Sequence, residues 1–286
     1  MIKNFIVPVD FSEDSLKGLD LAILFSRKTY SNIQMVYVQK KTAEHFPSRI
    51  REEYNFAKDK FEKILQANIQ KLGNNSKLRY IIKKGPKVYE EVVNQAESYK
   101  DSIITSSTHG ASGFEEFFIG SNAFKIISAT TRPVITIRKG MVPKDITKIV
   151  LPIDTMVETR QKVPMTADIA ELFGAEVHVV EVSSTKSSKI LKRLGAYSKQ
   201  ASSYLRGRGL NVVNDSIVGD NIADLTVDYA QSINADMISI ITEQGTSITN
   251  LILGNQAQQI LNRALIPVLN ITPKEMHLKG SFSALG

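Results

Sequence analysis

A loop in the first half of the chain combines hydroxyl, imidazole and glycine residues at a spacing that suits anion binding. It begins as Ser107-Thr108-His109-Gly110 and, after nine more residues, reaches Gly120-Ser121-Asn122. The short apolar run 102–105 before it is typical of a buried strand, and residues 124–127 after it are typical of a helix's first turn. Such a corner directs backbone N–H groups and the positive end of a helix at one point, which favours a phosphate. The alternative is a structural loop whose glycines satisfy turns with a positive φ.

The same loop contains His109, the histidine best placed for chemistry. No serine or aspartate accompanies it at a spacing that indicates a catalytic triad, so we predict a structural hydrogen-bonding role for His109 and no catalytic residue. Glu115 and Glu116, which we expect at the exposed start of a helix, are alternative ligands for a nucleotide-bound cation. The other histidines show no metal-ligand spacing. We therefore expect no protein-held metal, and any Mg²⁺ would arrive with the phosphates of a ligand.

Strands and helices alternate around this loop. Apolar runs predict strands at residues 4–10, 33–38, 79–82, 102–105 and 133–138, with helical segments between them. This alternation predicts a parallel sheet with helices on both faces, in which ligands bind beyond the carboxyl ends of the strands, where strand order reverses. Asp10, Val38 and Ser107 each end or follow a strand, so we expect them to converge there. The alternative role for Asp10 is to start the helix whose first residues are Ser12-Glu13-Asp14.

The whole series of elements occurs twice. Asp154 lies 144 residues after Asp10, at the end of a similar apolar run, and later landmarks such as Pro133 and Pro267 are 134 residues apart. The predicted fold class is therefore α/β, with two tandem doubly wound domains, each a five-stranded parallel sheet with helices on both faces. We place these domains at residues 1–140 and 146–273, followed by a tail at 274–286.

Composition narrows the range of partners. The chain has 286 residues, no cysteine and a net charge of +7, and all of the excess charge lies in residues 1–143, where 22 basic residues face 15 acidic ones. A positive field favours an anionic ligand. The alternative is a solvated basic surface, since Lys58, Lys60, Lys63 and Lys71 are expected on one long polar helix. The basic residues lack interleaved aromatics and no nucleic-acid motif occurs, so we expect no nucleic-acid partner. The start of the sequence lacks a signal-peptide layout and no apolar run would span a bilayer, so we expect a cytoplasmic protein without a membrane partner.

Four stretches give the chain a resemblance to the universal stress protein family, in its tandem two-domain form. They are Pro8-Val9-Asp10-Phe11-Ser12, Thr108-His109-Gly110-Ala111-Ser112-Gly113, Phe118-Ile119-Gly120-Ser121-Asn122 and Pro133-Val134. The resemblance covers roughly residues 2–139 and 147–272, and it implies an adenine nucleotide alpha hydrolase-like fold. The family's nucleotide motif is Gly, two residues, Gly, nine residues, Gly, then Ser or Thr. Ser107 stands in place of its first glycine.

The resemblance implies ATP or a related adenine nucleotide as the ligand of the first half. Asp10 would meet the ribose or adenine, and Pro8, Val9 and Val38 would frame the adenine. The phosphates would lie at Gly110, Gly120, Ser121 and Asn122, within the loop that begins at Ser107, Thr108 and His109. In the second half, Gly245 is followed by eight residues before Gly254, Asn255 replaces the serine, and we expect Glu243 at the place of Thr108. A carboxylate repels a polyphosphate. We therefore predict weak or no nucleotide binding in the second half.

Three functions remain open on these residues. The first is a stress-response module that binds nucleotide in its first half and signals through conformation or unknown protein partners, with at most slow ATP hydrolysis. The second is a nucleotide-independent scaffold. The third, an adenylating enzyme, is disfavoured because Asp10-Phe11-Ser12-Glu13 stands where such an enzyme has a Ser-Gly-Gly-x-Asp-Ser loop. In the resembling family the fifth strands mediate dimerisation, so we expect residues 134–138 and 268–272 to form an intramolecular pseudo-dimer; a homodimer of whole chains stays open.

Overall fold

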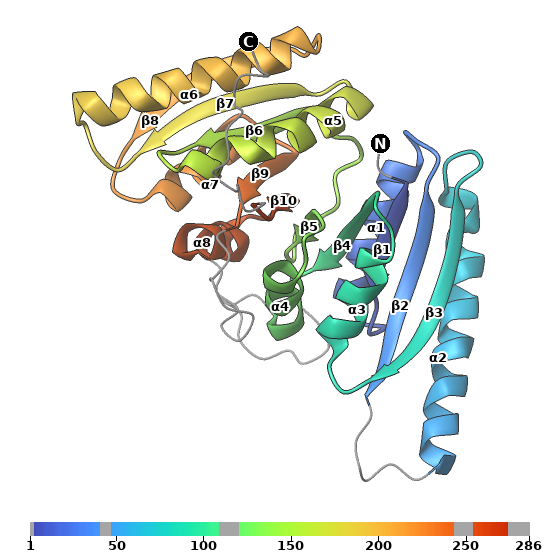
Figure 1. Cartoon of the computed structure of the whole chain (residues 1–286). Helices are drawn as coiled ribbons and strands as arrows, with labels where there is room; N and C mark the ends of the chain where they lie inside the picture. Colours follow the sequence, from blue (N-terminus) through green and yellow to red (C-terminus); the bar gives the residue numbers. More distant parts are fainter. Residues whose placement is uncertain (1–2, 41–46, 109–119, 243–253, 274–286) are drawn as a thin grey trace.

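In the computed structural model, the two halves of the chain share one sheet of ten strands (Figure 1). The structure describes residues 3–40, 47–108, 120–242 and 254–273. The strand order is β3-β2-β1-β4-β5-β10-β9-β6-β7-β8, so each half repeats the order 3-2-1-4-5. All pairs within a half are parallel, as alternation of strands and helices predicts. The predicted α/β class, with helices on both faces of mostly parallel strands, is confirmed.

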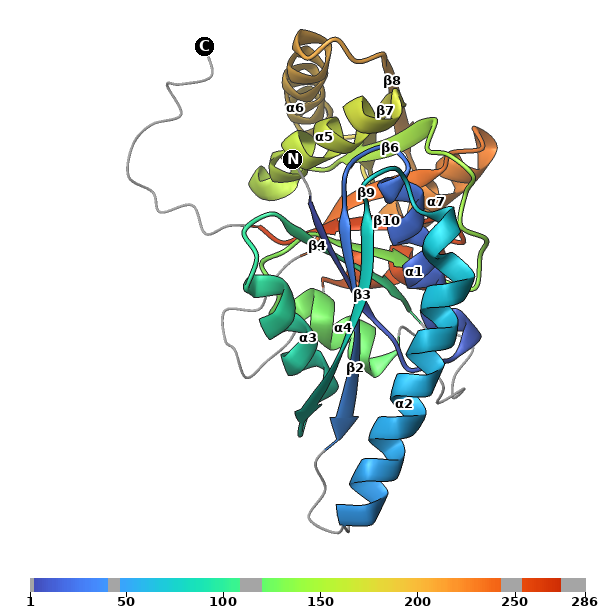
Figure 2. The ribbon, with the colours of Figure 1, turned by 90° about the vertical axis from the view of Figure 1, so that its right-hand side faces the viewer.

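The elements of the first half have the following bounds. The strands are β1 (Asn4–Pro8), β2 (Asn32–Lys40), β3 (Lys77–Gly85), β4 (Ser102–Ser107) and β5 (Val134–Ile137). The helices are α1 (Glu13–Ser26), α2 (Pro47–Asn68), the short η1 (Ile69–Lys71), α3 (Val88–Glu97) and α4 (Ser121–Ala129). Helix α2 runs past the end of the strands that it covers (Figure 2), and Ala57 and Phe61 are its buried residues. Its remaining surface is therefore largely polar and exposed.

The second half has the corresponding elements, with one addition. Its strands are β6 (Lys148–Ile153), β7 (Glu176–Ser183), β8 (Val212–Val218), β9 (Met237–Ile241) and β10 (Val268–Ile271). Its helices are α5 (Val163–Phe173), α6 (Ser188–Gly207), α7 (Ile222–Ser232) and α8 (Asn255–Arg263). The 3-10 helix η2 (Val157–Lys162) precedes α5, where the first half has the α-helical turns of α1. The two halves thus differ in the segment that immediately follows the first strand of each.

Each face of the sheet carries its own hydrophobic core, shared by both halves. One core contains Phe25 of α1, Phe61 of α2 and Ile169 of α5, together with Leu205 of α6. The other contains residues of the remaining four main helices, namely Val92 of α3, Ile126 of α4, Val227 of α7 and Ile260 of α8. Neighbouring strand residues alternate between the two cores, because successive side chains of a strand point to opposite faces. The helices are thereby sorted by face in the same way in each half.

The halves join where β5 pairs antiparallel with β10. Val268 lies opposite Thr136 and Asn270 opposite Val134. Isolated apolar edge strands tend to pair, and here each fifth strand covers the edge of the other. The junction fits the expected intramolecular pseudo-dimer, and it turns what we expected as two sheets into one continuous sheet.

Candidate functional site

The carboxyl ends of β1 and β4 meet at the point where strand order reverses. β1 pairs with β2 from Asn4–Asn32 to Pro8–Val36 and, on its other side, with β4 from Asn4–Ser102 to Ile6–Ile104. The chain therefore leaves β1 toward one side of the sheet and returns to its other side with β4. This is the location at which open α/β sheets bind ligands.

Asp10 follows β1 directly and is tied into the turn that starts α1. Its Oδ1 accepts hydrogen bonds from the backbone N–H of Ser12 (3.0 Å) and from the Ser12 hydroxyl (2.6 Å). The Ser12 Oγ in turn accepts from the N–H of Ser15 (3.1 Å), so Ser12 is the N-cap of α1. The prediction that Ser12-Glu13-Asp14 starts a helix is confirmed. The cap itself is Ser12, and the exposed Asp10 orients it.

Helix α1 lies directly on β4. A Cβ built at Gly18 would be 2.8 Å from the carbonyl oxygen of Thr105, closer than side-chain carbons approach a backbone oxygen. Gly18 therefore permits a helix–strand contact that a larger residue would prevent. This contact fixes the start of α1, and with it Ser12 and Asp10, relative to the end of β4.

The aromatic packing behind Asp10 was not anticipated from the sequence. Phe11 has φ +66, which is unusual for a residue other than glycine, and its ring stacks on Tyr37 at 5.0 Å between centroids. It also meets Phe56 and Phe61 edge-on. These contacts stabilise a backbone conformation that is otherwise unfavourable. Burial, together with a 2.7 Å hydrogen bond to Glu53, raises the pKa of Tyr37, so its hydroxyl remains a proton donor.

The predicted adenine frame is divided between the two faces of the sheet. Val9 packs in the core with α1 and α2, whereas Val38 packs in the core with α3 and α4. Both side chains are buried, and Pro8 is half-buried. The N–H of Val9 donates to Val36 O at 2.9 Å, which holds the ends of β1 and β2 together. Val9 and Val38 therefore do not form a pair of side chains around one cavity; Val9 follows the last residue of β1, and Val38 lies two residues before the end of β2.

The start of α4 is held against the end of β4. Thr108 N–H donates to Ile137 O at 2.9 Å, and Gly120 N–H donates to Thr108 O at 2.5 Å. Gly120 caps α4 without a side-chain hydrogen bond, and Ser121 and Asn122 are exposed. Ser107 and Thr108 are buried. His109, Gly110, Glu115 and Glu116 lie outside the described residues. The first N–H groups of α4 thus stand beside the β4 end, where they can bind an anion.

Among the described residues of the site, the Ser12 hydroxyl is not a poised nucleophile. The Ser12 hydroxyl donates to Asp10 and accepts from Ser15, so it is engaged in both directions. Among residues 3–40, 47–108, 120–242 and 254–273, no group of three or more His, Cys, Asp or Glu side chains is close enough to hold a metal ion. In the same part of the chain, no helix has the length and apolarity needed to cross a bilayer.

Comparison with known proteins decides the family. The model of the universal stress protein family matches residues 1–138 and again residues 145–271. The chain belongs to the universal stress protein family. Universal stress protein YxiE of Bacillus subtilis (strain 168) is 25% identical over 151 residues, which amount to 48% of this chain and 100% of that protein. The double match confirms the tandem two-domain form.

Solved universal stress proteins share the fold of this tandem chain. One from Archaeoglobus fulgidus DSM 4304 has a TM-score of 0.75 at 19% identity, with 95% of this chain and 97% of that one covered. Another, from Pseudomonas aeruginosa UCBPP-PA14, has a TM-score of 0.65 at 17% identity, covering 95% of this chain and 94% of that one. The adenine nucleotide alpha hydrolase-like fold expected from the sequence is therefore confirmed.

At the same strand ends, the second half of this universal stress protein repeats several hydrogen bonds of the first. Thr242 N–H donates to Ile271 O at 2.9 Å, as Thr108 N–H does to Ile137 O, so Thr242 is the counterpart of Thr108. Our expectation that Glu243 holds that place was wrong by one residue, because the apolar pattern does not fix the register of the loop. Glu243 and Gly245 lie outside the described residues. Gly254 caps α8 as Gly120 caps α4, and Asp154 Oδ1 accepts from Met156 N–H at 2.8 Å.

A lysine is buried beside this second strand end, and the sequence analysis missed it. Lys162 is 2% exposed, and its Nζ donates one hydrogen bond, 3.2 Å to Thr159 Oγ1. Burial lowers the pKa of Lys162 to about 8, against the opposing effect of the Asp154 carboxylate. The sequence offered one signal: counting 144 residues back from Lys162 leads to Gly18. The position that the first half gives to a glycine thus carries a long, buried side chain in the second half.

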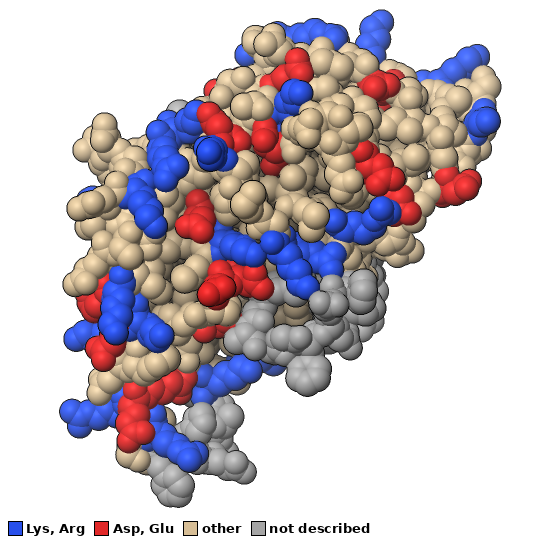
Figure 3. All heavy atoms as spheres, turned by 180° about the vertical axis from the view of Figure 1, so that it is seen from behind, with Lys and Arg blue, Asp and Glu red and all other residues tan. Residues whose placement is uncertain are grey.

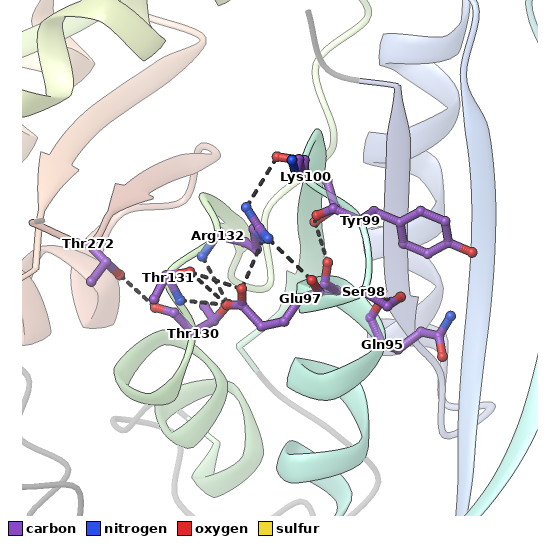
Figure 4. Close-up of polar contacts among 11 residues, drawn as sticks. Gln95, Glu97, Ser98, Tyr99, Lys100, Thr130, Thr131, Arg132 and Thr272 are labelled. Atoms are coloured by element: carbon purple, nitrogen blue, oxygen red, sulfur yellow. Dashed lines mark hydrogen bonds and ion pairs between the residues drawn. The ribbon is translucent and has the colours of Figure 1, made fainter.

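A second polar cluster links the two halves away from the Asp10 site (Figure 4). Glu97, at the end of α3, accepts from the N–H of Thr131 (2.8 Å) and from the hydroxyl of Thr130 (2.9 Å), and it pairs with Arg132 at 3.1 Å. Thr272, which follows β10, donates to Thr130 O at 3.0 Å. The turn before β5 is therefore bonded both to α3 and to the end of the last strand of the second half.

Proposed function

We propose that this universal stress protein binds an adenine nucleotide in its first half and reports its occupancy through conformation or a protein partner. The nucleotide phosphates lie at the start of α4, at Gly120, Ser121 and Asn122, and the ribose or adenine meets Asp10. Residues 1–140 form the ligand-binding domain and residues 146–273 its partner domain. The supporting observation is the hydrogen bond from Gly120 N–H to Thr108 O, which holds the free end of a helix at the strand-order reversal beside Asp10.

Charge supports an anionic ligand for this half. Its excess of seven positive charges lies within residues 1–143, while the rest of the chain is neutral. A divalent cation, where needed, accompanies the phosphates, as Mg²⁺ commonly does, because it is held largely by substrate oxygens and water. The role is binding, with at most slow ATP hydrolysis, since the described site residues include no activated nucleophile.

A thermal-shift titration with ATP and Mg²⁺ tests this proposal, with a matched pair of variants. A ligand that binds only the native state raises Tm by mass action. Gly120 has φ −56 and ψ 140, and Gly254 has φ −54 and ψ 143, so valine fits the backbone equally well at either position. Gly120→Val places a branched side chain among the phosphate-binding N–H groups and abolishes the shift. Gly254→Val, the control in the second half, leaves it intact.

The nucleotide-independent scaffold is the competing function, and Ser107 favours it. This residue replaces the first glycine of the family's nucleotide motif, and it is buried at the end of β4. An unchanged Tm at millimolar ATP, with and without Mg²⁺, would support the scaffold over the nucleotide module. Two equivalent ATP sites per chain would contradict the proposed division between the halves.

A further inference from the structure

A basic groove lies along α1, away from the strand ends that form the Asp10 site. It has a volume of about 440 Å³ and is lined by four residues of α1, by its C-cap Arg27, by Lys71 of η1 and by the linker residues 139–144. We call it the linker groove. Three segments that are distant in sequence form its walls, so tertiary packing, and not one basic run, brings its side chains together. Its volume falls in the range of small-molecule sites.

The charges of the linker groove are almost all of one sign. Its basic residues are Lys17, Arg27, Lys71, Lys139 and Lys144, and Asp20 is its acidic residue. Like charges within about 10 Å repel one another at moderate ionic strength, and a bound anion relieves that repulsion. Burial raises the pKa of Asp20, while Lys71 and Arg27 act in the opposite direction, so the acid faces two of the groove's cations.

Several of these basic side chains have N–H groups that can donate hydrogen bonds to a ligand. Arg27 Nε donates to Lys71 O at 3.2 Å, which orients the guanidinium, and its two Nη groups make no hydrogen bond to the described residues. Lys71 Nζ donates to Asn68 Oδ1 at 2.9 Å, a neutral partner. Lys144 is exposed and forms no ion pair within the described part of the chain. By contrast, Lys17 is paired with Asp14 at 2.8 Å.

We propose that the linker groove binds a small molecule that carries two or more phosphate groups. The guanidinium fork of Arg27 matches two phosphate oxygens, and the lysines add point charges around it. Ile23, Leu24 and Val142 line the same groove and offer apolar contact to the remainder of the ligand. On the described part of the face shown in Figure 3, basic and acidic side chains are interspersed and form no continuous basic band. The groove itself is bounded by part of α1, one residue of η1 and six linker residues, and this small extent favours a compact polyphosphate over a nucleic-acid backbone.

Binding here would connect the two halves. The linker is packed tightly at Gly140, where an added Cβ would lie 1.7 Å from the carbonyl oxygen of Leu265 in the turn between α8 and β10. Lys28 of the α1 C-terminal turn also pairs with Asp145 of the linker at 2.9 Å. An anion held between α1 and residues 139–144 therefore contacts a segment that is fixed to the second half, and it stabilises the junction between the halves.

Calorimetric titration of the full chain with inorganic tripolyphosphate tests the linker groove. The titration uses the Gly120→Val background, so that the Asp10 site contributes nothing and the outcome is independent of the proposed nucleotide binding. We expect one site. The double variant Arg27→Gln/Lys144→Glu should weaken it by about tenfold or more, because charge-assisted hydrogen bonds and long-range attraction are both lost.

The matched control changes the same charge elsewhere. Lys63→Gln/Lys199→Glu alters exposed residues of α2 and α6 that have no ion pair among the described residues, and it should change the affinity less than twofold. Equal weakening by the control would show a diffuse field in place of a site and would overturn the proposal. So would the absence of tripolyphosphate binding at low salt, or tighter binding of a single-stranded oligonucleotide than of tripolyphosphate.

Discussion

Lys162 holds, in the second half, the sequence position that Gly18 holds in the first, 144 residues earlier. Gly18 has no side chain, whereas Lys162 has a long one that is buried. Gly18 lets α1 rest on the backbone of β4, with its hypothetical Cβ 2.8 Å from Thr105 O. Lys162 ends the 3-10 helix η2, and its buried ammonium reaches Thr159 near the end of β6. The first turns after β1 and β6 are thus built differently in the two halves, and the predicted difference in nucleotide binding stays a prediction.

Lys162→Met should stabilise the protein at neutral pH. The pKa of Lys162 is lowered from 10.5 to about 8 in the folded state, so between pH 8 and 10.5 the unfolded chain binds more protons than the native one. The native protein is therefore penalised below pH 8 and gains stability as the pH rises through that window. We expect Lys162→Met to add about 2 kcal/mol to the free energy of unfolding at pH 7. That advantage should shrink between pH 8 and 10.5, as measured by urea unfolding.

Lys162→Arg is the control for this prediction. An arginine keeps its charge throughout the accessible pH range, so it should destabilise the protein at every pH and remove the same pH dependence. If the unfolding free energies of native protein and Lys162→Met run parallel from pH 7 to 10.5, Lys162 does not titrate in the folded state as its burial requires.

Substitutions at Ser12 and Asp10 should distinguish the capping of helix α1 from the binding of a ligand. Ser12→Ala removes the acceptor for Ser15 N–H and should lower stability by about 1 kcal/mol. Asp10→Asn retains an Oδ1 that accepts from both Ser12 donors, so stability should change little. The loss of its charge should nonetheless lower the affinity for ATP by about tenfold if Asp10 accepts hydrogen bonds from the ribose hydroxyls.

Chemical denaturation and ATP titration of both variants provide the measurement. The prediction is contradicted if Asp10→Asn binds ATP as tightly as the native protein, because Asp10 then serves α1 alone. It is also contradicted if Ser12→Ala has the same urea midpoint of unfolding as the native protein, since the hydroxyl would then contribute nothing to the stability of the start of α1.

The sequence predicted those parts of the fold that follow from the local pattern of apolar residues and from the pairing rules of parallel strands. Alternating apolar runs predicted the strands and the repeat, and strand ends placed Asp10 near Thr108 because parallel strands share a carboxyl edge. Phe11 was out of reach, since its positive φ depends on aromatic partners 26 to 50 residues away. Lys162 was equally hidden: beside Arg160 and Gln161 it looks like a surface residue, and only tertiary packing buries it.

Glu97→Gln should destabilise the protein in a pH-dependent way. Burial pushes the pKa of Glu97 upward, but hydrogen bonds from Thr131 and Thr130 and the charge of Arg132 outweigh it, and the pKa falls below its usual 4.5. A lowered folded-state pKa contributes stability above the unfolded value, and that stability is lost as the pH falls through the folded one. At pH 7 we expect a loss on the order of 1 kcal/mol, since the partly exposed side chain is screened by solvent.

The control for Glu97→Gln is Glu90→Gln. Glu90 lies on the same helix α3, seven residues before Glu97, and its substitution breaks an exposed ion pair with Lys87. Glu90→Gln should leave the unfolding midpoint at pH 7 unchanged within error. The difference between Glu97→Gln and the native protein should diminish below pH 4.5. A difference that persists undiminished at pH 3 would mean that lost packing, and not the carboxylate, accounts for the effect.

Asn270 should carry much of the specificity of the junction between the halves. Asn270 and Thr136 hold matching places in β10 and β5, 134 residues apart, and they meet across the antiparallel pair, where Asn270 Nδ2 donates to Thr136 Oγ1 at 3.3 Å and to Val134 O at 3.1 Å. Both side chains are buried. Asn270→Ala removes these donors and leaves a small cavity, so we expect a loss of about 2 kcal/mol in the free energy of unfolding.

Asn270→Thr is the informative companion, because it makes the two matching residues identical. A threonine hydroxyl can still donate across the junction, so this variant should recover at least half of the stability lost in Asn270→Ala. Hydrogen exchange of the β5 and β10 amides reports the same bonds directly, and protection should fall in Asn270→Ala before it falls in β2 or β7. Uniform loss of protection across all ten strands would instead show that the two halves unfold as one unit, with no weak point at their junction.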